Sequence, residues 1–278
     1  MNAPVPDPPG QPADHLDRRR LLRLAGGVGL ASVVGACSSW RPDSAAAPAS
    51  RPGQPPTANP AAAPATAADL PTTPPPRPVT AGATAALMLC RDAWGARPAR
   101  AGGKAHTITR MTLHHEAVVL GDNRNAPGHL RSDQRYHQDQ HGWVDIAYHV
   151  GIDRDGNIYQ LRTTEIAGDT ATDYDTTGHF LVLCEGDFDQ EAVPEAQLHA
   201  AAVAFAWAAA TFHVASGTLA GHRDLAQTSC PGANLYAHLA SGDLKRRIDE
   251  LLAAGGVDLQ PFCGSEAAAK VAAIEAGE

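Results

Sequence analysis

Residues 142–161 read GWVDIAYHVGIDRDGNIYQL, and they decide the fold because they predict a β-hairpin. The apolar residues 146–152 have the composition of a β-strand, and residues 158–161 predict the returning strand. Between them, Asp153-Arg154-Asp155-Gly156-Asn157 is rich in residues that favour turns. We therefore expect one antiparallel pair of strands near the middle of the folded part of the chain.

Strands and helices are expected to alternate on both sides of this hairpin. Apolar runs and helix signals predict strands at 107–114 and 179–185, helices at 130–141, 194–214 and 243–254, and a loop at 217–234. Strands interleaved with helices, together with one hairpin, predict an α/β fold. The expected architecture is a single domain with a central mixed β-sheet flanked by helices.

Composition divides the 278 residues into four regions. We expect an export signal at 1–37, a Pro/Ala-rich disordered linker at 38–86, a folded domain at 87–255, and a C-terminal tail at 256–278 with no assigned function. Pro and Ala occupy 27 of the 46 positions from 41 to 86, and repeated Pro prevents regular helix or sheet hydrogen bonding. The linker is interpreted as a spacer between a membrane anchor and the folded domain.

The first 37 residues have the layout of an export signal. Arg18-Arg19-Arg20-Leu21-Leu22 precedes an apolar, Gly-rich run from 24 to 36, and the pair Arg18-Arg19 resembles a twin-arginine signal. An amphipathic surface helix is the alternative, but the run has no polar face. The run ends Val34-Gly35-Ala36-Cys37, which resembles a lipoprotein processing box; ordinary cleavage nearby is the alternative. We expect an exported, periplasmic protein, anchored to the outer membrane by a lipid on Cys37.

Charge and cysteine content restrict the partners further. The formal net charge is -8 and no basic patch is present, so nucleic acid is not expected as a partner. Apart from Cys37, Cys184 lies in an apolar strand and is interpreted as a small buried hydrophobe. Cys90 and Cys263 flank the domain and could tie its ends together. Cys230 could bind a metal as a thiolate, or be a third structural cysteine, or have a different disulfide partner.

Six short motifs then occur in a fixed order along the chain. They are Trp94-Gly95-Ala96, Leu113-His114-His115, residues 142–149, Asp155-Gly156-Asn157-Ile158-Tyr159, Glu185-Gly186-Asp187-Phe188, and Gly221-His222-Arg223-Asp224 continuing to Thr228-Ser229-Cys230-Pro231-Gly232. From Trp94 to about Leu239 the chain resembles the type 2 N-acetylmuramoyl-L-alanine amidase family. That family includes the phage amidase lysozymes and the animal peptidoglycan recognition proteins.

This resemblance implies a zinc site made by His114, His222 and Cys230. Two neutral imidazoles and one thiolate fill three corners of a tetrahedron, and water takes the fourth corner of a catalytic site. Tyr148 matches the family's catalytic tyrosine, although without the motif it would be interpreted as a packed core aromatic. Thr228 matches a position that faces the reacting carbonyl in the family, or else braces its loop.

Other polar residues beside these motifs are weaker candidates. His115, His149 and Glu185 could orient the ligands or be structural, whereas Asp145 and Asp224 are interpreted as structural. Residues 167–170 depart from the family, which usually carries a His in this loop. Residues 177–180 also replace the family's usual approach to the next strand. These loops line the substrate groove in the family, so the resemblance does not define a preference for particular stem peptides.

The implied function is hydrolysis of the amide between the lactyl group of N-acetylmuramic acid and L-alanine, in peptidoglycan or its fragments. The expected cofactor is Zn²⁺, and the chain is expected to be a monomer. One alternative is a non-catalytic peptidoglycan-binding module, but such relatives typically lose a zinc ligand, and here all three positions are filled. Another is a passive lipoprotein tether, which accounts for residues 1–86 but not for the ordered His, Tyr and Cys motifs.

Overall fold

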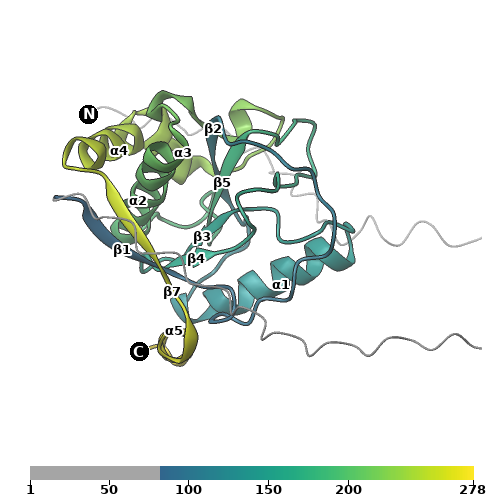
Figure 1. Ribbon diagram of the computed structural model, residues 1–278. Helices are drawn as coiled ribbons and strands as arrows, with labels where there is room; N and C mark the ends of the chain where they lie inside the picture. Colours follow the sequence, from purple (N-terminus) through teal and green to yellow (C-terminus); the bar gives the residue numbers. More distant parts are fainter. Residues whose placement is uncertain (1–81) are drawn as a thin grey trace, which may run out of the picture. The chain divides into compact units, whose positions relative to one another are not determined.

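The structure is a computed structural model that describes residues 82–278. A mixed seven-stranded β-sheet runs through this part of the chain (Figure 1). The strand order is β6-β2-β5-β3-β4-β1-β7. The strands are β1 (Thr84–Leu89), β2 (Arg110–His115), β3 (Val150–Ile152), β4 (Ile158–Gln160), β5 (His179–Cys184), β6 (Leu219–Gly221) and β7 (Val257–Phe262). The predicted export signal, Cys37 and most of the predicted linker lie outside the described residues.

The predicted hairpin is present as β3 and β4, which form the antiparallel pair of the sheet. The other neighbouring strands pair in parallel. The strand expected at 146–152 is shorter than predicted, because only residues 150–152 pair with both β4 and β5. This arrangement confirms the mixed α/β fold expected from the sequence.

Helices cover both faces of the sheet, which explains why every residue of β5 is buried. One face packs against α2 (Glu195–Phe212) and α4 (Asp243–Ala253), and the other against α1 (Ala126–Asp139) and α5 (Gly264–Ala276) (Figure 1). Small Ala side chains on α2 allow the helix to approach the sheet closely. The helix predicted at 130–141 begins earlier, at 126, because Pro127 is tolerated in a first helical turn.

The two ends of the described region correct the predicted domain boundaries. Residues 256–278, expected to be a tail, form β7 and α5, and β7 pairs in parallel with β1 over residues 84–89. The domain therefore starts before residue 87 and includes the tail. The sequence did not predict β7 because it contains Pro261, and Pro is unfavourable in central strands. Pro is tolerated here because β7 is an edge strand. Similarly, the loop predicted at 217–234 contains β6 and the start of α3 (Ala233–Ala240).

A disulfide joins the ends of this outer strand pair. Cys90 follows β1 directly, Cys263 follows β7 directly, and the two Cα atoms are 5.0 Å apart. Cys184 and Cys230 are free and buried. Among the helices of residues 82–278, none combines the length and the hydropathy that a membrane span needs.

Replacing Cys90 and Cys263 together by Ala is expected to lower the free energy of unfolding by about 2–5 kcal/mol, because the disulfide closes a long loop. Chemical denaturation of the full chain with and without reductant measures this. Reductant should destabilise the parent chain and leave the double variant unchanged. Equal sensitivity of both proteins would show that the disulfide does not stabilise the fold.

Candidate metal centre and pocket

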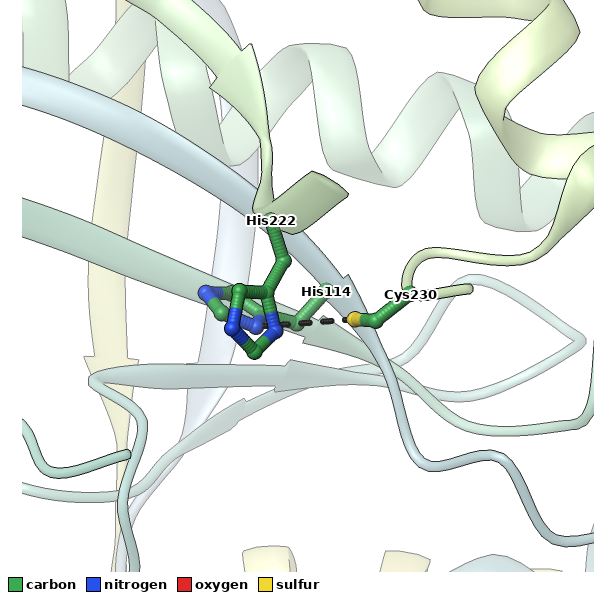
Figure 2. Close-up of side chains that lie close together, drawn as sticks. All are labelled: His114, His222 and Cys230. Atoms are coloured by element: carbon green, nitrogen blue, oxygen red, sulfur yellow. Dashed lines mark hydrogen bonds between the residues drawn. The ribbon is translucent and has the colours of Figure 1, made fainter. Parts of the chain in front are cut away.

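His114, His222 and Cys230 converge although they are far apart in the sequence. Their potential ligand atoms all lie within 4.8 Å of one another, and all three residues are buried (Figure 2). His114 belongs to β2, His222 follows β6, and Cys230 lies in the loop before α3. Because β6 and β2 are neighbouring parallel strands, His222 is brought to the end of the sheet where β2 presents His114.

The donor set fits a zinc ion. Cys230 Sγ lies 3.6 Å from His114 Nδ1. A tetrahedral ion with a Zn–S bond of about 2.3 Å and a Zn–N bond of about 2.0 Å would separate such donors by roughly 3.5 Å. Two nitrogens and one sulfur are also the ligand types that zinc prefers.

Two hydroxyl groups contact the imidazole nitrogens Nε2 of His222 and His114. Thr172 Oγ1 lies 2.7 Å from His222 Nε2, and Tyr174 Oη lies 3.4 Å from His114 Nε2. Each contact engages Nε2, and Nδ1 of His114 is the nitrogen that faces Cys230. Polar partners of this kind fix the ring orientation of metal-binding histidines. No motif in the sequence marks Thr172 or Tyr174, because their partners His222 and His114 lie 50 and 60 residues away along the chain.

The Cys230 loop is held by backbone contacts on both sides. The His115 N–H lies 3.4 Å from Cys230 Sγ, and the Arg223 N–H donates to the Cys230 carbonyl at 2.9 Å. Gly232 has φ +86°, and a Cβ there would lie 2.6 Å from the Phe188 carbonyl carbon. Glycine is therefore required for the loop to approach the segment that follows β5.

Burial controls the ionisation of these groups. Burial, followed by the nearby His222, holds the pKa of His114 well below its usual value, and burial lowers the pKa of His222 to about 4. Both rings are therefore neutral, as metal binding requires. Burial raises the pKa of the Cys230 thiol to about 12. A thiolate at this position needs a compensating cation, which is consistent with a metal ligand.

The three side chains line a pocket of about 330 Å³. An aromatic wall borders it, in which the rings of His141 and Trp143 stack with centroids 4.4 Å apart. Tyr136 and His137 extend this wall. Residues 169–172, in the loop that contains Thr172, form another side of the pocket. The volume falls in the usual range for a small-molecule site, about 300–1,000 Å³.

Tyr148 and Thr228 both line this pocket. The Tyr148 ring centroid lies 5.1 Å from that of His114. Burial, followed by the charge of Cys230, raises the pKa of Tyr148 well above its usual value, so its hydroxyl stays protonated. Thr228 Oγ1 accepts the Cys230 N–H at 3.2 Å, so it braces the loop while facing the pocket.

Two of the other polar residues beside the sequence motifs, His149 and Asp145, have structural roles. His149 is engaged on both ring nitrogens by backbone groups of Ile166 and Leu181, which makes it structural. Asp145 accepts from Arg91 and Gln134, as expected of a structural residue.

The remaining candidates also lie outside the metal centre itself. Asp224 accepts from the Gly221 N–H and the Tyr236 hydroxyl, which again indicates a structural role. His115 contributes its backbone N–H to the Cys230 sulfur, while its ring packs beside Phe188. Glu185 does not line the pocket and lies in a separate acidic cluster.

Comparison with known proteins places residues 104–233 in a profile described as N-acetylmuramoyl-L-alanine amidase. Peptidoglycan-recognition protein LB of Drosophila melanogaster is 32% identical over 164 residues, which are 58% of this chain and 70% of that protein. An N-acetylmuramoyl-L-alanine amidase of Sus scrofa is 30% identical over 191 residues, covering 60% of this chain and 31% of that protein. The profile match spans His114, Tyr148, His222 and Cys230.

The fold is also similar to that of solved structures. A variant of Drosophila PGRP-LB in complex with tracheal cytotoxin superposes with a TM-score of 0.50 and 29% identity, covering 56% of this chain and 93% of that one.

Replacing Thr172 by Val should weaken zinc binding by about 10- to 100-fold, because Nε2 of His222 loses its hydroxyl partner. Competition with a chromogenic chelator measures the affinity. Thr163→Val, at an exposed threonine outside the pocket, is the matched control and should bind like the parent. Equal affinities of the Thr172→Val variant and the parent chain would exclude a role of Thr172 in orienting His222.

Proposed function

Since the chain belongs to the N-acetylmuramoyl-L-alanine amidase family, we propose that it is a zinc-dependent amidase acting on peptidoglycan or its fragments. The bond hydrolysed is the amide between the lactyl group of N-acetylmuramic acid and L-alanine. The observation that carries the proposal is the convergence of His114, His222 and Cys230 on one wall of an open pocket. Three protein ligands are the number typical of a catalytic zinc site, whereas structural sites have four.

His114, His222 and Cys230 would hold the zinc, which when bound supplies Lewis acidity that polarises the scissile carbonyl and acidifies water. Tyr148 acts from the same pocket as a hydrogen-bond donor. Its hydroxyl is protonated at neutral pH, so it donates to the oxygen that becomes negative during attack on the amide. Thr228 holds the Cys230 loop through its oxygen and can direct its proton into the pocket.

The pocket also favours a sugar–peptide substrate. Stacked rings of His141 and Trp143 offer a flat apolar surface beside the polar metal site. The related PGRP-LB variant was solved with tracheal cytotoxin bound, which supports a peptidoglycan fragment as the ligand class. A binding module without activity is the second candidate, because a recognition protein shares the fold, but the filled ligand set and Tyr148 favour catalysis.

We further propose that the chain is exported and lipid-anchored through Cys37, at the outer membrane. The support comes from the twin-arginine-like segment and from the processing box that ends at Cys37. The Cys90–Cys263 disulfide adds independent support, because disulfides persist in oxidising compartments such as the periplasm. In this arrangement, the Pro/Ala-rich segment would allow the domain to reach the wall.

The main test incubates the full chain, loaded with zinc, with purified peptidoglycan and with soluble muropeptides. Mass spectrometry should detect free stem peptides that begin with L-alanine. His222→Ala should reduce their release by about a hundredfold or more, because it removes a ligand of the ion that stabilises the transition state. Binding of peptidoglycan without peptide release, despite bound zinc, would favour the binding module.

Tyr148→Phe separates catalysis from metal binding. The variant should retain its zinc, and its kcat should fall about 10²-fold with little change in KM, because an oxyanion donor acts in the transition state. Steady-state kinetics together with metal analysis measures both effects. An unchanged kcat would show that the Tyr148 hydroxyl only packs against His114.

A further inference from the structure

Glu116, His129 and Glu185 form a second group of potential metal ligands. Their ligand atoms lie within 4.8 Å of one another. None of the three lines the pocket, and none belongs to the predicted zinc site. The group is therefore distinct from the site of the proposed amidase reaction.

The ends of the two central strands place the carboxylates side by side. The last paired residues of β2 and β5 are His115 and Cys184, so Glu116 and Glu185 follow in register. The Glu116 N–H donates to the Cys184 carbonyl at 3.2 Å, which continues the pairing beyond the strands. Because side chains alternate along a strand, Glu116 lies on the same face as His114. This is the face that α1 covers, and α1 supplies His129.

Glu185 is the unusual member of the group. Its side chain is fully buried, and among residues 82–278 neither of its carboxylate oxygens has a hydrogen-bond partner. A buried charge without a partner lowers the stability of a folded protein by roughly several kcal/mol. Two neighbouring carboxylates accept hydrogen bonds only, so Glu116 can satisfy Glu185 only by sharing a proton with it.

His129 provides the third donor and the side that faces solvent. Its Nδ1 lies 3.0 Å from Glu116 Oε2 and 4.0 Å from Glu185 Oε2. The His129 side chain is 27% exposed, whereas that of Glu116 is 5% exposed, so solvent reaches the group at His129. Asp133 lies one turn further along the same face of α1 and places another carboxyl group close to Glu116. Burial, followed by the charge of Glu116, raises the pKa of Asp133 well above its usual value. In the described part of the chain, no Lys or Arg forms an ion pair with Glu116 or Glu185.

We propose that Glu116, His129 and Glu185 bind one divalent transition-metal cation of the Zn²⁺ or Mn²⁺ class. Two carboxylates and an imidazole are a mixed oxygen and nitrogen set, which suits these ions better than Mg²⁺ or Ca²⁺. The ion would neutralise the buried Glu185 and connect α1 to the ends of β2 and β5. The proposal concerns residues outside the pocket and does not depend on the amidase activity.

The test counts metal ions on the full chain after chelation and titration with Zn²⁺ alone or Mn²⁺ alone, followed by removal of unbound metal. With Zn²⁺, the parent should hold about two ions, and Glu185→Gln about one. Anomalous diffraction at the metal edge should place the second ion among Glu116, His129 and Glu185. The exposed Glu165→Gln is the matched control and should retain both ions.

His129→Asn, on the solvent-facing side, provides a second variant if Glu185→Gln does not fold, and it should also lose one ion. His222→Ala separates the two sites, because it should lose the other ion and retain this one. A parent with a single ion that is lost in His222→Ala and retained in Glu185→Gln would overturn the second site, while leaving the proposed amidase intact. An ion lost only in Glu185→Gln and His129→Asn would support the second site and contradict the zinc site in the pocket.

Discussion

The parallel pairing of β2 with β5 is the constraint on which the rest of the structure depends. Both strands are central, and their register runs unbroken from Arg110 and His179 to His115 and Cys184. One face of this pair packs against α2, and the other against α1. Because side chains alternate, the same strand that fills the core with Met111 and Leu113 presents His114 to the pocket. The position of the first predicted ligand is thus determined by the packing of the core.

The other two ligands depend on weaker local structure. His222 follows the three-residue strand β6, and Cys230 lies in a loop held by backbone contacts to His115 and Arg223. Hydroxyl groups from yet another loop complete the arrangement around the rings. The pocket therefore combines one wall that the sheet provides with others that loops provide. The loop residues 169–172 line the pocket but lie outside the strand that holds His114.

The sequence predicts the centre of this fold better than its edges. The hairpin at 146–161 and the strand at 179–185 are marked by apolar runs and turn residues, and both are present. The strand β7 was not predicted because it contains Pro261. Pro is tolerated on an edge strand, but the sequence alone does not show that β7 lies at the edge of the sheet. Motif order identified His114, His222 and Cys230, which the fold brings together. Thr172 and Tyr174 could not be found in this way, because they contact His222 and His114, which lie 50 and 60 residues away in the sequence.

The pairing of β1 with β7 has a mechanical consequence. Tension that reaches Thr84 acts along β1, which lies between β4 and β7 and is parallel to both. Backbone hydrogen bonds on both sides are then sheared together, which resists extension more strongly than opening them one at a time. Beyond Leu89, the covalent bond between Cys90 and Cys263 transfers the force to the segment that precedes α5. The strands β2 and β5 lie outside this route, so a domain pulled from its N-terminal side would keep its pocket undistorted.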